Sequence, residues 1–301
     1  MAVFPIKQGG TGADYASNST PKFIPQIWSS KLVEKFYKAT VFGEIANTDY
    51  EGEIKNQGDT VIIRTRPTLK VQDYQKGMDL VYEAPTSEAV ELQIKYGKYF
   101  AFEVKLVDKV QSDLNLMNEF STDGAEQMKI AIDADVLKGY IDDIEKNAAA
   151  KNGINLGAKD VTKADIIDFI VDLGTALDKN NIPAQGRWIV IPPEIAGLIK
   201  KSDLKDASLA GDDTSIARNG RLGMIDRFTL YLSNNLPAGA AKGSTKILFG
   251  HKAGITFASQ ITAMEKLPNP KDFGQYVRSL QVFGFMVLNY EAVGTADVTV
   301  K

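Results

Sequence analysis

The sequence of 301 residues predicts an α+β protein, and three observations support this fold class. Residues 112–146 form a proline-free stretch rich in helix-forming residues. Residues 58–74 and 87–104 contain strand-like alternation with many Val, Ile, Tyr and Phe. Residues 277–300 are strand-like again, and no internal repeat is visible. This order indicates one region of the fold interrupted by another.

The first 22 residues are dominated by Gly, Ser, Asn and Thr, and their apolar residues are too sparse to bury a core. Such a composition is typical of a disordered tail, and an arm held by a partner subunit is the alternative. A helix is expected from Pro21 onward, because Trp28, Leu32 and Phe36 recur every four residues.

A long two-stranded excursion is expected after Asn47, with a polar loop at residues 76–86 between its strands. Such a hairpin is marginally stable by itself in water. No nearby segment is suited to cover it, so two interpretations stay open: a surface hairpin packed on its own domain, or an arm laid on a neighbouring molecule. Basic residues punctuate the excursion, either as protection of a strand edge or for docking onto an acidic neighbour. They are Arg64, Arg66, Lys70 and Lys76.

The helix predicted at residues 112–146 would be a rod of roughly 50 Å at about 1.5 Å per residue. Ser112 or Asp113 can cap its start. Its apolar residues form one stripe in the first half and occupy two sides in the second half, which predicts more than one covering neighbour. No sustained heptad is present, so a coiled coil is not expected.

A second unit is expected after residue 154. Thr162 and Asp165 resemble a capping box before a helix that ends at Asn180 and Asn181. The segments that follow are a buried strand, a helix that begins near Pro193, a polar loop, two short strands, a short helix mixed with a strand, and final strands that return to the first unit. Their residues are 187–191, 193–202, 205–221, 228–233, 245–250, 253–267 and 277–300.

Composition excludes several classes of function. The net charge of −3, with acidic and basic residues interspersed, argues against a protein that binds nucleic acid by neutralising phosphates. Cysteine is absent, so the chain holds no disulfide and no thiolate metal site, which suits a reducing cytoplasm. No secretory signal and no membrane-spanning apolar run are visible, so we expect a soluble intracellular product.

No catalytic centre, cofactor site or metal site is expected. His251 is the only histidine and no G-x-S-x-G motif occurs, so His251 is expected to be a turn or interface residue. Residues 239–246 fail the spacing of a phosphate loop and are expected to be a flexible linker. Asp133 and Asp135 are two apart on a helix and should face different directions. The acidic groups at residues 142–145 and 211–215 are expected to be solvated.

Three stretches resemble the major capsid proteins of tailed bacteriophages of the Hong Kong 97 type. Residues 23–67 are similar to that family's N-terminal helix and the start of its extended loop. Residues 186–204 with 219–237 are similar to the strand–proline–helix unit and the glycine turn of its axial domain, and residues 246–293 to its closing segment. Each motif is loose, and the order and spacing of the three make the match specific.

The resemblance implies a Hong Kong 97-type capsid fold with six consecutive parts. They are an N-arm (1–22), the N-terminal helix of the peripheral domain (23–48), an extended β-hairpin loop (49–96), the peripheral domain with a long spine helix (97–154), the axial domain (155–267) and return strands to the peripheral domain (268–301).

The implied function is structural, without enzymatic activity. Such a chain self-assembles into hexamers and pentamers that form the icosahedral shell of the virion around double-stranded DNA, and it assembles in the cytoplasm of the bacterial host. Implied partners are other copies of the chain, a portal protein, a decoration protein and weakly contacted DNA, with no membrane. A separate scaffolding protein is expected because no long segment precedes the arm, unless a longer precursor is trimmed.

Candidate inter-subunit contacts lie in the arm and the extended loop: Phe4, Tyr15, Arg64, Arg66, Lys70, Tyr74, Lys76 and Tyr82. Some members of the family crosslink through a lysine and an asparagine, but nothing around Lys70, Lys76 or Asn289 indicates such a bond. Two rival functions stay open, namely an encapsulin-like nanocompartment shell that packages enzymes and a soluble hydrolase that uses His251.

Overall fold

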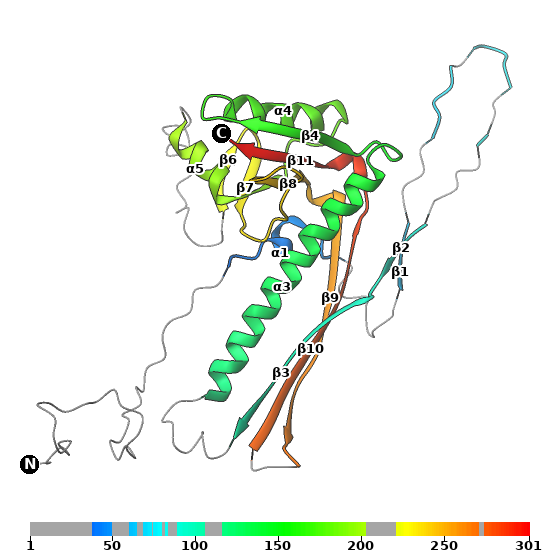
Figure 1. The fold of residues 1–301 in the computed structure, drawn as a ribbon. Coiled ribbons are helices and arrows are strands. Elements are labelled where there is room, and N and C mark those ends of the chain that lie inside the picture. The colour runs from blue at the N-terminus through cyan, green and yellow to red at the C-terminus, as the bar shows by residue number, and fades with distance from the viewer. Residues whose placement is uncertain are drawn as a thin grey trace, which may run out of the picture.

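The computed structural model describes residues 38–49, 60–64, 69–73, 75–79, 82–83, 89–105, 116–202, 221–270 and 274–301. A projecting hairpin, a long three-stranded sheet crossed by one long helix, and a compact unit built on a six-stranded sheet make up the fold (Figure 1). The predicted helix before residue 38, the loop around residues 205–220 and the cap at Ser112 or Asp113 lie outside the described residues.

The three-stranded sheet is antiparallel, with β10 between β3 and β9. Its strands are β3 (Tyr96–Lys105), β9 (Ile255–Pro268) and β10 (Gly274–Val287). The predicted long helix is confirmed as α3 (Leu116–Asn147), which lies across one face of this sheet (Figure 1).

The second half of α3 lies between the two sheets, which explains why its apolar residues occupy two sides. Tyr140 and Ile141 are fully buried and share one apolar core with Phe257 and Phe283 of the three-stranded sheet and Leu248 of the six-stranded sheet. The expectation of more than one covering neighbour is therefore confirmed for this half. Gly139 lets the helix approach β10 closely, since a Cβ there would lie 2.3 Å from the ring of Phe285.

The six-stranded sheet has the order β4-β11-β8-β5-β7-β6, with parallel pairing of β4 with β11 and of β5 with β7. Its strands are β4 (Ile154–Val161), β5 (Arg187–Ile191), β6 (Arg221–Ile225), β7 (Phe228–Leu232), β8 (Ser244–His251) and β11 (Val293–Val300). Helices α4 (Ile166–Lys179) and α5 (Pro193–Lys201) cover one face, and α3 packs on the other.

Strand β5 is buried along its whole length, as predicted, because its side chains alternate between these two cores. The predicted helix is confirmed as α4, which buries Ile166, Ile170, Leu173 and Leu177 at helical spacing along one face. It ends before Asn181, which takes a φ of 57°, a conformation that asparagine tolerates better than most residues.

Three local expectations were wrong. The final strands do not both return to the first unit: β10 does, whereas β11 lies between β4 and β8 in the six-stranded sheet. The short helix expected in residues 253–267 is only the 3-10 turn η3 (Lys252–Gly254), because β9 begins at Ile255. No capping box forms at the start of α4, since the Thr162 hydroxyl donates to the Asp165 carboxylate at 2.5 Å instead.

Candidate assembly surfaces

The base of the hairpin packs on its own subunit. Strands β1 (Thr60–Arg64) and β2 (Ala89–Gln93) pair antiparallel. Val61 and Leu92 on their inner face are buried against Ala258 of β9 and Val282 of β10. The base therefore follows the first of the two interpretations, a hairpin packed on its own domain, and the strands that cover it come from much later in the chain instead of from a nearby segment.

The distal part of the hairpin stands away from the body of the subunit (Figure 1). Val71 is 99% exposed and Tyr82 is 87% exposed, and Leu69 and Met78 are exposed as well. Apolar side chains in contact with water over a whole loop are typical of a surface that binds a partner.

Gly284 lets β2 cross β10 at close range. A Cβ at this position would lie 2.4 Å from the backbone oxygen of Gln93. The end of β2 therefore packs directly against the backbone of β10.

We expect Gly284→Ala to destabilise the fold by about 1–3 kcal/mol, because an extra methyl group would force the backbone apart at a tightly packed position. Calorimetric unfolding of the unassembled subunit measures this loss, and electron microscopy measures the yield of assembled particles, which should fall. Gly197→Ala is the matched control, since no atom lies within 4 Å of its Cβ position. Equal effects of the two substitutions would contradict this account.

Four of the predicted contact residues lie in described parts of the hairpin. Arg64 is exposed at the end of β1, and Lys76 lies in a turn closed by a hydrogen bond from the Met78 amide to the Gln75 oxygen. The backbone N–H of Lys70 donates to Glu83, which neighbours Tyr82. Phe4, Tyr15, Arg66 and Tyr74 lie outside the described residues. Participation of all eight in inter-subunit contacts stays a prediction.

The chain that follows the N-terminal arm is fixed to α3 by a buried carboxylate. The Asp133 Oδ1 accepts hydrogen bonds from the backbone N–H groups of Val41 and Phe42 at 2.9 and 3.0 Å. Its Oδ2 accepts from Asn235 Nδ2, after β7, at 2.7 Å. Asp133 is fully buried, and burial raises its pKa although these three hydrogen bonds oppose the rise. Asp135 instead pairs with Lys98 near the surface, so the two carboxylates diverge as predicted.

Further contacts hold the same segment against β9. The single-turn helix α1 (Phe42–Ile45) is followed by Asn47, whose N–H donates to the Ile255 oxygen and whose oxygen accepts from the Phe257 N–H, both at 3.0 Å. Residues 41–47 are therefore held to α3 and β9, and Asp133 links them to the segment after β7. This anchor was not predicted from the sequence.

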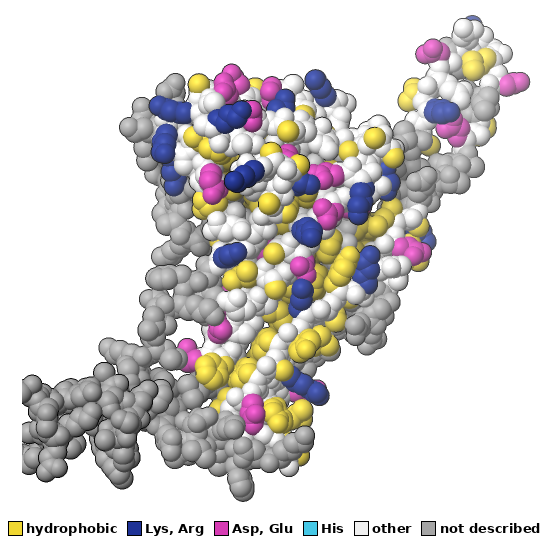
Figure 2. Space-filling model, viewed as in Figure 1, with side chains coloured by type: hydrophobic (Ala, Val, Ile, Leu, Met, Phe, Trp, Pro, Cys, Tyr) yellow, Lys and Arg dark blue, Asp and Glu magenta, His cyan; other side chains and the backbone are white. Residues whose placement is uncertain are grey.

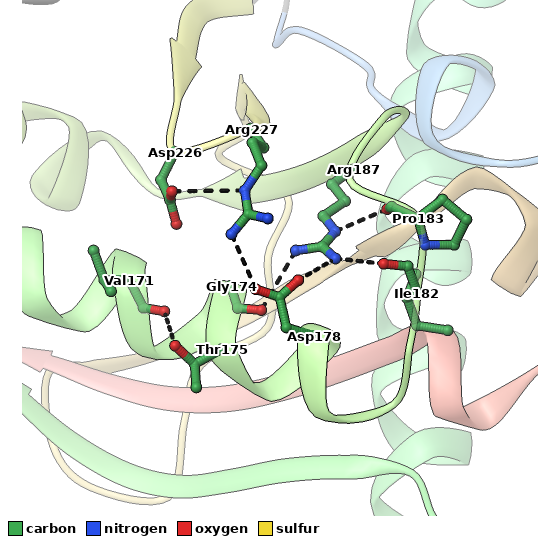
Figure 3. Close-up of polar contacts among 9 residues, drawn as sticks. All are labelled: Val171, Gly174, Thr175, Asp178, Ile182, Pro183, Arg187, Asp226 and Arg227. Carbon is green, nitrogen blue, oxygen red and sulfur yellow. Dashed lines mark hydrogen bonds and ion pairs between the residues drawn. The ribbon is translucent and has the colours of Figure 1, made fainter.

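A buried arginine organises one end of the six-stranded unit (Figure 3). Arg187 is 1% exposed and donates to the backbone oxygens of Pro183, Ile182 and Gly174 and to the Asp178 carboxylate at 2.6 Å. Arg227, in the β6–β7 turn, donates to the second oxygen of Asp178 at 3.0 Å. The hydrogen bonds from Arg187 and Arg227 lower the pKa of Asp178. The cluster ties α4, the start of β5 and the β6–β7 turn together.

His251 serves a turn, as the sequence analysis expected. Its Nδ1 accepts from the Ala253 N–H at 3.1 Å and caps η3.

Residues 239–246 differ from the expected flexible linker, because the Ala240 N–H donates to Asp297 of β11 at 2.8 Å and β8 begins at Ser244. Within the described parts of the chain, no three His, Asp or Glu side chains are grouped to hold a metal ion, and no helix is long and apolar enough to cross a membrane.

Comparisons with known proteins agree with this geometry. A family model described as a phage capsid protein matches residues 89–296. A structure from Mycobacterium phage Che8 is 27% identical with a TM-score of 0.71, covering 92% of this chain and 98% of that chain. A capsid structure of cyanophage P-SCSP1u is 14% identical with a TM-score of 0.69, covering 95% and 97%.

A capsid of Ralstonia phage GP4 is 14% identical with a TM-score of 0.63, covering 96% of this chain and 99% of that chain. A search of curated proteins gives no match. The family model spans well over half of the chain, and the structural likeness extends over nearly all of it. The chain therefore belongs to the phage capsid protein family and is a tailed-phage major capsid protein with the Hong Kong 97-type fold.

Proposed function

We propose that this capsid protein self-assembles into hexamers and pentamers that close an icosahedral shell around double-stranded phage DNA. The observation that supports it best is the projecting loop, where Val71 and Tyr82 are almost fully exposed in the single subunit. Apolar side chains presented so far from their own core gain contact only on another subunit.

The physical logic of such a shell suits a loop of this kind. Hexamers and pentamers are built from head-to-tail contacts, in which one patch of each subunit meets a different patch of the next. A single loop contributes a weak contact, but many linked contacts raise the effective concentration and hold a closed shell together. We infer that the loop and the N-terminal arm provide much of the energy between subunits.

The proposed partners follow from this role. They are other copies of the chain, a portal protein, a separate scaffolding protein and a decoration protein. A net charge of −3 supports only weak, non-specific contact with the packaged DNA. A capsid protein is located in the virion, and we propose that assembly takes place in the cytoplasm of the bacterial host.

Deletion of residues 68–86 should abolish closed shells while leaving the subunit folded. The deletion leaves residues 65–67 and 87–88 between β1 and β2, five in all, a length that closes an ordinary hairpin. The buried base on β9 and β10 is untouched. Circular dichroism checks the fold, and electron microscopy, with and without a candidate scaffolding protein, checks for shells and for rings of five and six subunits.

A second variant, with residues 68–86 replaced by a Gly/Ser segment of equal length, separates the side chains from the length of the loop. It should fail to assemble as well. Shells of unchanged yield and heat stability from both variants would contradict the role of the loop. A wild-type chain that stays monomeric under every condition, or particles that enclose proteins instead of DNA, would contradict the proposed function itself.

A further inference from the structure

A groove with a volume of about 460 Å³ runs between the first half of α3 and strand β3. On the helix side its lining residues share one face, and they include Phe120, Gly124 and Met128. Figure 2 shows apolar side chains gathered over this part of the molecule. Phe120 is 44% exposed, although its ring makes an edge contact with Phe102 at 5.8 Å between centroids.

The strand side of the groove is the edge of β3. The five consecutive residues Lys98–Phe102 all line it. Successive side chains of a strand point to opposite faces of the sheet, so a groove lined by five consecutive residues of this edge strand meets its backbone as well as its side chains.

This edge is open to another strand. β3 pairs with β10 along its whole length without a shift in register, and no described strand lies on its other side. Residues Tyr96–Lys105 contain no proline and no bulge, two of the usual protections of an edge, and Lys98 is neutralised by its ion pair with Asp135. An open edge beside an apolar groove suits an extended peptide whose backbone bonds to the strand and whose alternate side chains fill the groove.

We propose that residues 2–6 of a second copy of this chain add to the edge of β3 as a strand, with Phe4 and Ile6 in the groove. The inference rests on the proposed shell function and names one of its contacts. Five residues of strand span about 17 Å, and so do the five residues of β3 that line the groove.

The sequence Ala2-Val3-Phe4-Pro5-Ile6 fits a strand that pairs on one side only. Alternate residues of a strand direct their backbone groups to the same edge and their side chains to the same face. If Phe4 and Ile6 bond to β3, Pro5 points away from it, and its missing N–H costs no hydrogen bond. Phe4 and Ile6 then share the face toward α3, while Val3 lies on the open face with Tyr99 and Ala101.

The position of residues 41–47, which are anchored on α3, indicates that residues 2–6 come from a second copy of the chain and not from the same copy. The described chain is bonded to α3 at Val41, through Asp133, whereas the groove lies on the helix face of Gly124 and Met128. Asp133 is five residues from Met128 and nine from Gly124, spacings that place it on the far side of the helix. The groove and Val41 of one subunit thus lie on opposite sides of α3, and a head-to-tail ring brings opposite sides of successive subunits together.

The absence of cysteine allows a direct test. Val3→Cys and Ala101→Cys would be made in separate chains, co-assembled, oxidised and run on a non-reducing gel. We expect a two-chain product joining the different variants, at least tenfold above the control pair of Val3→Cys with Asp172→Cys, which places the thiol on the exposed side of α4. A chain carrying both cysteines should form linked oligomers, and a bond confined within single chains would overturn the proposal.

Hydrogen exchange provides a readout that does not depend on register. The amides of residues 97–103 should exchange at least tenfold more slowly in shells than in free subunits, and Phe4→Asp should remove this protection. Protection that survives deletion of residues 2–6 would assign the groove to another occupant and overturn the proposal. Shells with neither the bond nor the protection overturn the docking alone, whereas failure of the wild-type chain to form any shell overturns the proposed function with it.

Discussion

Asp133→Ala is expected to destabilise the subunit by about 3–5 kcal/mol, since three buried donors lose their acceptor at about 1–3 kcal/mol each. These donors are the backbone N–H groups of Val41 and Phe42 and the side-chain amide of Asn235. Denaturant unfolding of the unassembled subunit measures the loss. Hydrogen exchange at the amides of Val41 and Phe42 should accelerate as well, because the segment before α1 detaches from α3.

Asp133→Asn is the matched control for this prediction. The Asn235 Oδ1 is buried and has no hydrogen-bond partner among the described residues. If the Asn235 amide rotates, this oxygen accepts from the new amide at position 133, whose own oxygen still serves Val41 and Phe42. We therefore expect a change within about 1 kcal/mol, the net value of an ordinary hydrogen bond. Equal losses in the alanine and asparagine variants would contradict the hydrogen-bonding role.

The stabilities of the wild type and of Asp133→Asn should depend differently on pH. Burial raises the pKa of Asp133 in the folded state, so the folded protein binds a proton more readily than the unfolded chain. The cost of the buried charge is present above the folded pKa and is relieved as the pH falls through it. The wild type should gain stability relative to Asp133→Asn on acidification in this window. A constant difference between the two proteins from neutral pH downward would show that Asp133 does not titrate in this way.

Arg187→Met is expected to cause the second large loss. Three backbone oxygens around the turn after α4 would lose their donor, at about 1–3 kcal/mol for each acceptor that stays buried. Thermal unfolding measures the effect, and limited proteolysis should show cleavage in residues 180–186. Arg227→Met is the control, because Arg227 is 45% exposed and makes only ion pairs near the surface, with Asp178 and Asp226. It should cost under about 1 kcal/mol, as an exposed ion pair does. Similar losses from both variants would refute the buried role of Arg187.

The sequence predicted those elements whose signal is local. The spacing of apolar residues within α3 and α4, and the Pro193 that begins α5, are properties of short windows. The sheet to which β11 belongs cannot be read from a short window, because the alternation of residues 296–300 identifies a strand without identifying its neighbours. The support of the hairpin was missed for the same reason, since Ala258 and Val282 lie far along the chain from Val61.

The buried polar groups show the same limit. Asp133 stands in a helix beside Asp135 and reads as a surface carboxylate, because its partners lie 92 and 102 residues away along the chain. Arg187 reads as the charged boundary of a strand. Among the predicted contact residues, Lys70, Lys76 and Tyr82 do lie in the projecting loop. Whether they contact other subunits, as we propose, is a property of the assembly that a single chain does not contain.

The place of β11 has a consequence for synthesis of the chain on the ribosome. Among the strands that the structure describes, β11 alone joins β4 to β8, and it follows the others of that sheet in the sequence. A nascent chain translated as far as β10 therefore holds β4 apart from β8, β5, β7 and β6, with the edges of β4 and β8 unpaired. Because domains fold as their residues emerge, the sheet closes only after β11 has left the ribosome. The native subunit surface therefore forms only after all other strands of this sheet have been made, which delays association between unfinished copies on one messenger RNA.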